Sequence, residues 1–272
     1  MIPNDDSLIL FKVGAYKWME KIKEGTLSFG ALGSFIEIAR ANGNEEQGDR
    51  DEAIFARLKV GNPKIQEMKD RLVEDLEIIK DADPAYVKLR RKSSYLIPTF
   101  CLYSYRGYDL LDNEIVKPGK QRIAHFFDNR IFSAFADDKV RNVMSSENTF
   151  SMLVLQAANL KYKVLGAALL YKKPITIKHV NYTEFEKDEF FIEPTDNRDE
   201  LFYKFPKYAY QYEARICMVH NLLPSVKDRL SLYIGPIIEN KDGFLIRSQV
   251  SFSIGANIVL EKDDVEPPPI IT

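Results

Sequence analysis

Residues 7–30 read SLILFKVGAYKWMEKIKEGTLSFG and contain three expected elements in a row. The apolar run over residues 7–13 has the length of a strand. Residues 15–24 place Trp18 and Ile22 four positions apart among Lys and Glu, which predicts an amphipathic helix. Gly25 follows where a helix commonly ends, and residues 26–29 resume an extended pattern. The stretch therefore predicts a strand, a helix and a second strand.

The rest of the chain predicts helices and strands without a regular alternation. Residues 42–52 are acidic and contain glycine, which predicts an exposed loop. We expect strands over residues 95–105, 150–155, 175–182, 210–219 and 250–254, and a helix that begins near residue 157. Pro98 favours an edge or a bulge for the first of these strands. Apolar residues also recur at spacings of three and four in a helical pattern, at Ile65, Met68, Leu72, Leu76 and Ile79.

These elements predict an α+β fold in which flanking helices cover a core formed by a mixed sheet. No Gly/Ser-rich or Pro-rich linker divides the chain, so we expect a single domain over residues 1–272. The helical pattern between residues 65 and 79 predicts a helical insertion in this domain at about residues 53–93.

Composition excludes several classes of protein. The 272 residues include 38 basic and 40 acidic side chains, which argues against a strongly basic nucleic-acid coat protein. Cys101 and Cys217 lie far apart and cannot form a disulfide framework or a four-cysteine zinc site. The chain also lacks the glycine-rich phosphate loops of common nucleotide-binding folds. It has neither a long apolar segment nor the pattern of a signal peptide, so we expect a cytoplasmic protein without membrane contact.

A second informative stretch, residues 205–216, reads FPKYAYQYEARI. In an extended strand, Gln211, Glu213 and Arg215 would share one face, and the tyrosines would occupy the other. Glu213 and Arg215 could then point into a cleft and carry chemistry. They could equally form an ordinary surface ion pair, which contributes little to stability.

The order of these two stretches resembles the ADP-ribosyltransferase fold. In that family the first strand carries an Arg or His that contacts NAD, and a second strand carries a Ser or Tyr near the nicotinamide ribose. A late strand carries the catalytic Glu. The resemblance implies Lys12, Ser28 (or Phe29) and Glu213 at these positions. Lys12 departs from the usual Arg or His. Lysine can still pair with a phosphate, but only as a point charge rather than through two parallel hydrogen bonds.

The resemblance further implies an NAD-dependent ADP-ribosyltransferase, with NAD as a substrate. Glu213 would stabilise the positively charged ribose as nicotinamide leaves, and Gln211 would take part in acceptor choice. Lys12 or Arg215 would neutralise the NAD diphosphate. Tyr212 or Phe29 would stack on nicotinamide, with core packing as an equally good alternative for both rings.

The chain also resembles a widespread family of bacterial and phage proteins, some encoded near anti-phage defence genes. The matching pieces are Phe11-Lys12, residues 48–52 (GDRDE) and residues 210–216 (YQYEARI). This resemblance implies a toxin or antiviral defence effector that modifies a protein or nucleic acid, with an antitoxin or another defence-system protein as partner. The alternative is a non-catalytic binding or sensor module of a phage-defence system, because fold resemblance does not fix function.

Residues 86–95 (YVKLRRKSSY) combine basic and tyrosine side chains. Such a stretch could guide a nucleic-acid acceptor through its phosphates, or could be a solvated face. A nuclease would need clustered acidic ligands for a metal. Asp49, Asp51 and Glu52 lie too close together on one predicted loop to favour that class.

Overall fold

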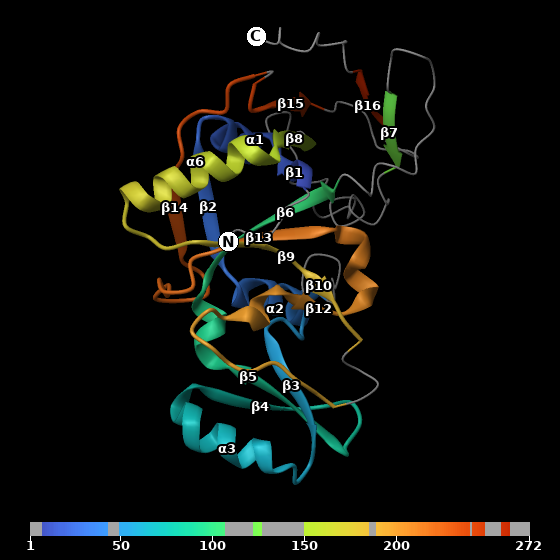
Figure 1. Ribbon diagram of the computed structural model, residues 1–272, viewed down its shortest axis with the longest axis vertical. Coiled ribbons are helices and arrows are strands. Elements are labelled where there is room, and N and C mark those ends of the chain that lie inside the picture. The colour runs from blue at the N-terminus through green and yellow to red at the C-terminus, as the bar shows by residue number, and fades with distance from the viewer. Residues whose placement is uncertain are drawn as a thin grey trace, which may run out of the picture.

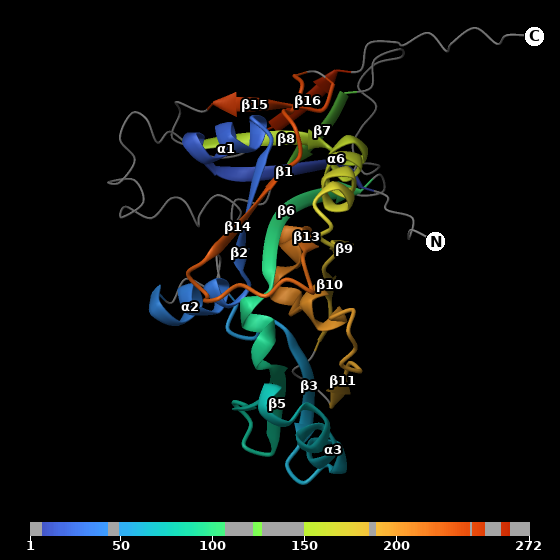
Figure 2. The same ribbon diagram turned by 90° about the vertical axis from the view of Figure 1, so that its left-hand side faces the viewer.

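The computed structural model describes residues 7–42, 49–106, 122–126, 150–184, 189–239, 241–247 and 257–261 (Figure 1). Within these residues, a large curled antiparallel sheet with its helices occupies one end, and a smaller sheet with one helix occupies the other (Figures 1 and 2). No helix in the described ranges is long and apolar enough to cross a membrane.

The larger sheet contains eight strands among the described residues, and six of them follow the order β14-β2-β6-β1-β8-β15. The other two continue from β6, which pairs with β13, and β13 pairs in turn with β9. The eight strands are β1 (Ser7–Ala15), β2 (Thr26–Ala31), β6 (Pro98–Arg106), β8 (Phe150–Gln156), β9 (Thr176–His179), β13 (Glu213–Cys217), β14 (Arg229–Tyr233) and β15 (Gly243–Arg247).

Strand β6 lies at the centre of this sheet and explains its curl. Its first residues, Pro98 and Thr99, pair with β2, and its last residues pair with β1. On its opposite edge it pairs with β13, so that Tyr103 lies between Phe11 and Glu213. Pro98 begins this central strand, where the missing backbone N–H is tolerated, and the expected edge or bulge is not found there.

Three helices pack on the larger sheet: α1 (Tyr16–Lys23), α2 (Gly33–Asn42) and α6 (Ala157–Leu170). The predicted strand–helix–strand opening is confirmed. Gly25 follows α1 with a φ of 97°, and a Cβ there would lie 2.3 Å from the carbonyl oxygen of Gly235. A main core cluster combines side chains from the sheet, α1 and α6, including Ile22, Phe29, Phe100 and Val164.

The smaller sheet has the order β11-β3-β5-β4 and its own core around Phe55, Met68 and Leu89. Its elements are β3 (Ile54–Lys59), α3 (Pro63–Leu72), the short 3-10 helix η1 (Val73–Asp75), β4 (Leu76–Lys80), β5 (Tyr86–Arg91) and β11 (Phe190–Phe191). The expectation of a helical insertion at residues 53–93 is therefore wrong in its content, since the segment holds three strands and one α-helix.

The error has a local cause. The helix ends at Leu72 because Val73 adopts a φ of 38°, and Leu76 and Ile79 belong to β4. A helix and the strand that follows it can both bury apolar side chains against one core. When only three residues separate them, the apolar positions of the strand can continue the three-and-four spacing of the helix.

The remaining described elements are short. Strands β10 (Asn181–Tyr182) and β12 (Tyr203–Lys204) pair in parallel, and β7 (Arg122–Phe126) pairs with β16 (Asn257–Glu261). The other 3-10 helices are η2 (Lys92–Leu96), η5 (Asp199–Phe202) and η6 (Pro206–Gln211). The α+β class is confirmed, but the core sheet is antiparallel rather than mixed. The strand expected over residues 250–254 lies outside the described residues.

Candidate functional site

The late stretch folds differently from the continuous strand that was predicted. Residues up to Gln211 form η6, and only Glu213 onward forms β13. Between them, Tyr212 adopts the left-handed conformation (φ 41°, ψ 47°). Its carbonyl oxygen accepts hydrogen bonds from the backbone N–H and the hydroxyl of Ser104 at 2.8 and 2.7 Å. This turn fixes where β13 begins, and thereby places Glu213 and Arg215.

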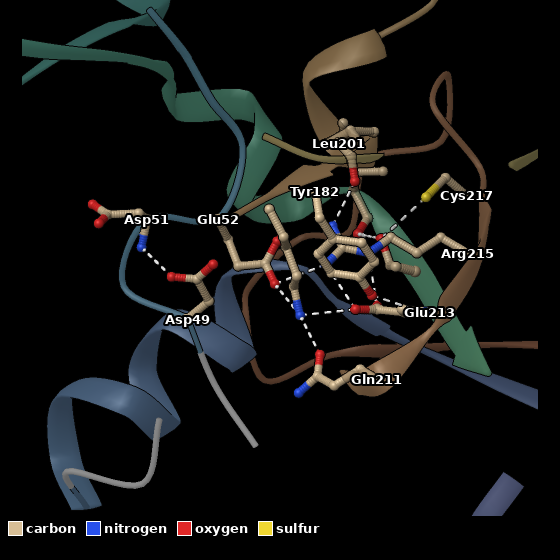
Figure 3. Close-up of polar contacts among 12 residues, drawn as sticks. Asp49, Asp51, Glu52, Tyr182, Leu201, Gln211, Glu213, Arg215 and Cys217 are labelled. Atoms are coloured by element: carbon tan, nitrogen blue, oxygen red, sulfur yellow. Dashed lines mark hydrogen bonds and ion pairs between the residues drawn. The ribbon is translucent and has the colours of Figure 1, made fainter. Parts of the chain in front are cut away.

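Glu213 and Arg215 belong to a buried ion network with Glu52 and Lys204 (Figure 3). The Nε of Arg215 lies 2.7 Å from Oε1 of Glu213, and its Nη2 lies 2.8 Å from Oε1 of Glu52. The Nζ of Lys204 lies 2.8 Å from Oε2 of Glu213 and 3.1 Å from Oε1 of Glu52. Two anions and two cations therefore alternate in a closed arrangement, which we call the charge quartet.

Neighbouring polar groups add further hydrogen bonds to the quartet, although Oε2 of Glu52 is buried without a hydrogen-bond partner. The Nζ of Lys204 donates to Oε1 of Gln211 at 3.1 Å, and Nη1 of Arg215 donates to the carbonyl oxygen of Leu201. The backbone N–H of Glu213 donates to the hydroxyl of Tyr182 at 2.9 Å. Arg215 is 0 % exposed and Glu213 is 6 % exposed, so these contacts lie inside the protein.

The charges of the quartet stabilise one another in their ionised forms. Burial alone would raise the pKa of Glu213, but Arg215 and Lys204 outweigh it and lower that pKa well below its ordinary value. Burial likewise disfavours charge on Lys204, yet Glu213 and Glu52 raise its pKa well above the ordinary value. At neutral pH both groups are therefore charged.

Asp49 stands beside the quartet as a third buried carboxyl group. Burial, followed by the negative charge of Glu52, raises its pKa to about 7 against the opposing charge of Lys204. Its Oδ1 accepts a hydrogen bond from the N–H of Asp51 at 2.8 Å, and its Oδ2 is buried without a partner. Asp49 and Glu52 are 2 % and 1 % exposed, so the prediction of an exposed loop over residues 42–52 is wrong at these two positions.

Lys12 also lies near Glu213. Its Nζ donates to the carbonyl oxygen of Cys101 at 2.6 Å, and Cys101 pairs with Arg215 across the sheet. Burial lowers the pKa of Lys12, while Cys101 and Glu213 act in the opposite direction. The structure thus brings Lys12, from the start of the chain, close to the late stretch that carries the predicted site residues Gln211, Glu213 and Arg215.

The other predicted site residues have different surroundings. Phe29 is 0 % exposed in the main core, with its ring 5.7 Å from that of Phe100. Ser28 pairs with Ser231 of β14, and the strand that carries it meets β6 at Pro98 and Thr99 rather than at Tyr103. Phe29 is therefore a core residue, and the carbonyl oxygen of Tyr212 holds the turn before β13 through its hydrogen bonds with Ser104.

Sequence reasoning missed two members of the quartet, Glu52 and Lys204. Glu52 was expected in an exposed loop, and Lys204 was not identified at all. A signal for Lys204 exists in residues 201–205 (LFYKF), where one lysine interrupts an apolar and aromatic run. A single charge in such a run indicates a side chain that must be buried with a counter-ion.

The basic stretch at residues 86–95 does not form a phosphate-binding surface. Arg90 and Arg91 are 0 % and 5 % exposed, and Arg91 forms an ion pair with the buried Glu200 at 2.7 Å. Lys88 forms an ion pair with Asp51 at 2.9 Å. These three residues are therefore not free to bind the phosphates of a nucleic acid. The stretch gives no support to the expectation that it guides a nucleic-acid acceptor.

Metal and thiol chemistry find little support in the described residues. No group of three or more His, Cys, Asp or Glu side chains in the described ranges is arranged to hold a metal ion. Burial raises the pKa of Cys217 to about 12 and that of Cys101 well above its ordinary value, so both remain thiols at neutral pH. A surface hollow of 390 Å³ lies near Gly30, Ser34 and Arg229, and no quartet residue lines it.

Comparisons with known proteins add no assignment: no protein-family model, no curated protein and no solved structure matches this chain.

The first prediction concerns the quartet's role in stability. Replacing Glu213 by Gln leaves Lys204 and Arg215 buried with one counter-ion between them, which we expect to cost about 3–5 kcal/mol of unfolding free energy. The control is Glu239→Gln, which removes an exposed ion pair with Lys23 and should change stability by less than about 1 kcal/mol. Urea denaturation of both variants measures the difference, and equal stabilities would contradict a structural quartet.

The second prediction concerns Asp49 and pH. Its pKa rises on folding from an ordinary 3.8 to about 7, so the folded protein keeps a proton that the unfolded chain loses. Its contribution to stability is therefore present below pH 4 and is lost as the pH rises from about 4 to 7. At about 1.4 kcal/mol for each pKa unit, the loss is on the order of 4 kcal/mol.

Asp49→Asn removes this titration. The unfolding free energy of the variant minus that of the wild type should rise between pH 4 and 7 and stay constant above. Denaturation curves at pH 4, 5.5, 7 and 8 test this, and parallel pH profiles for the two proteins would show that Asp49 does not titrate as proposed.

Proposed function

We propose that this chain is a non-catalytic binding module with an ADP-ribosyltransferase-like arrangement, and that it recognises a protein partner. The observation that carries the proposal is the occupancy of the Glu213 carboxylate. Its Oε1 is held by Arg215 and its Oε2 by Lys204, and all three side chains are buried.

The chemistry of ADP-ribosyl transfer explains why this occupancy matters. A catalytic Glu must accept a hydrogen bond from the ribose and present net negative charge to the cationic sugar that forms as nicotinamide leaves. In the quartet, the charges of Glu213 and Glu52 are balanced by Arg215 and Lys204. Freeing Glu213 would break buried ion pairs, at a cost of about 3–5 kcal/mol. The quartet therefore serves the fold better than it serves this reaction.

A second candidate function is ADP-ribosyl transfer itself, with NAD as substrate and a macromolecule as acceptor. One observation favours it: the opening strand and the late strand both pair with β6, and Lys12 lies within electrostatic reach of Glu213. In this proposal, Glu213 and Gln211 act at the reacting ribose, while Lys12 and Arg215 neutralise the diphosphate. The resemblance to bacterial and phage proteins supports a setting in phage defence for either function.

Incubation with NAD separates the two functions. The purified protein is given NAD labelled in the adenylate, with separate pools of protein, RNA and DNA, and free nicotinamide is measured. We expect neither nicotinamide release nor transferred label. Nicotinamide release or label transfer by the wild type would overturn the binding-module proposal in favour of the transferase if Glu239→Gln keeps the activity and Glu213→Gln or Gln211→Ala loses it. Circular dichroism of each variant confirms that it is folded.

A further inference from the structure

Helix α6 is apolar on two faces. One face packs on the larger sheet through Leu160, Val164 and Ala167. The other carries Tyr162, Leu169 and Leu170, which are 76 %, 81 % and 75 % exposed. A contiguous exposed apolar patch commonly marks an interaction site, so the second face is suited to a contact that the isolated chain does not make.

The exposed face has a notch at its middle. Tyr162, Gly166 and Leu170 follow one another at spacings of four and therefore lie along one line of the helix surface. A Cβ at Gly166 would meet no atom within 4 Å. The gap between Tyr162 and Leu170 can accept an apolar side chain from an opposing helix at close approach, in the manner of small residues at helix interfaces.

The charged side chains on α6 and on the residues that flank it in the sequence all have one sign. Residues 150–183 contain five lysines and neither Asp nor Glu. Lys163 and Lys178 pair with Asp242 and Asp199. In the part of the chain that the structure describes, Lys172 and Lys173 form no ion pair, and they directly follow the exposed Leu169, Leu170 and Tyr171. A helix C-terminus favours lysine through its dipole, but the dipole gives no reason for exposed leucines.

We propose that the face formed by Tyr162, Gly166, Leu169, Leu170, Lys172 and Lys173 docks an acidic amphipathic helix of a protein partner. Apolar residues of that helix pack on Leu169 and Leu170 and enter the notch at Gly166, and its Asp and Glu side chains pair with Lys172 and Lys173. This inference rests on the proposed binding function and names the chemistry of the partner. Charge complementarity selects an acidic segment, and the notch selects a helix over a flat surface.

The site has room to extend beyond α6. The Nζ of Lys163 donates to the carbonyl oxygen of Pro236, and Ile238, two residues further along, is 51 % exposed. Figures 1 and 2 show α6 on the outside of the larger sheet, away from the smaller sheet. A partner helix laid along α6 would therefore leave the charge quartet undisturbed.

The test uses three synthetic peptides on the full chain. One is an acidic amphipathic helix with Leu at positions i, i+3, i+4 and i+7 and Glu elsewhere on its flanks. The second has the same leucines with Lys in place of Glu, and the third has the acidic composition with scrambled leucines. Fluorescence anisotropy is expected to show binding of the first peptide alone. Equal binding or no binding of all three would overturn the proposal.

Variants locate the binding on α6. Leu169→Ser with Leu170→Ser should weaken binding at least about tenfold, whereas Leu222→Ser, at an exposed leucine outside α6, should leave it unchanged. Gly166→Leu should weaken binding while preserving the helix. Lys172→Glu with Lys173→Glu should lose the acidic peptide and gain the lysine peptide. Unchanged binding in the leucine and lysine variants would overturn the assignment to this face.

Two controls distinguish a protein partner from a lipid surface and the docking site from the proposed function. Vesicles of phosphatidylserine and phosphatidylcholine are tested in sedimentation, and binding to them that is lost in the leucine variant would replace the protein partner by an anionic lipid surface. Nicotinamide release in the NAD assay would overturn the proposed function and leave peptide binding to be judged separately. Absence of peptide binding in a protein inert toward NAD would overturn the docking site alone.

Discussion

The guanidinium of Arg215 is fully buried and holds together three segments that are distant in the sequence. It contacts Glu213 on its own strand, Glu52 just before β3 of the smaller sheet, and the carbonyl oxygen of Leu201 in η5. Lys204 then closes the arrangement by contacting both carboxylates. A buried guanidinium is costly unless its N–H groups have hydrogen-bond partners. The segments around Arg215 therefore have few other arrangements that would supply those partners. This pairing links the two sheets, together with the buried pair of Arg91 and Glu200 and an apolar cluster that includes Ala53, Leu201 and Cys217.

Such a buried network has an energetic cost. Removing four charges from water costs several kcal/mol for each ion, and their mutual attraction repays this only when the geometry is good. The distances in the quartet, between 2.7 and 3.1 Å, meet that condition. The same geometry commits Glu213 to its internal partners. A carboxylate whose two oxygens are both paired with buried cations is not available to bind a ribose. We therefore interpret the site as structural and place partner recognition on the surface of α6.

Sequence patterns predicted the parts of this protein that depend on local periodicity. The strand, helix and strand before residue 31 follow from apolar spacing and Gly25, and the pairing of Glu213 with Arg215 follows from their separation by two along a strand. Patterns failed where distant contacts decide. Leu76 and Ile79 continue a helical spacing, yet they belong to a strand because their backbones pair with β5, at Arg91 and Lys88. Glu52 looks exposed in an acidic loop, but it is buried against two distant partners, Lys204 and Arg215, and Arg215 lies 163 positions later. The run LFYKF at residues 201–205 signals a buried Lys204, but its pairing with Glu52 and Glu213 also depends on distant contacts.

The central claim is that Glu213 is an internally neutralised anion. Carbon-13 NMR of the protein labelled at the glutamate carboxyl carbons, with Glu213 assigned by its absence in Glu213→Gln, tests this directly during an acid titration with and without NAD. The account predicts that the Glu213 resonance stays in its ionised position until the protein unfolds in acid, because Arg215 and Lys204 lower its pKa, and that NAD does not move it. A resonance that titrates at or above the ordinary pKa of 4.5, or that shifts when NAD is added, would contradict the account.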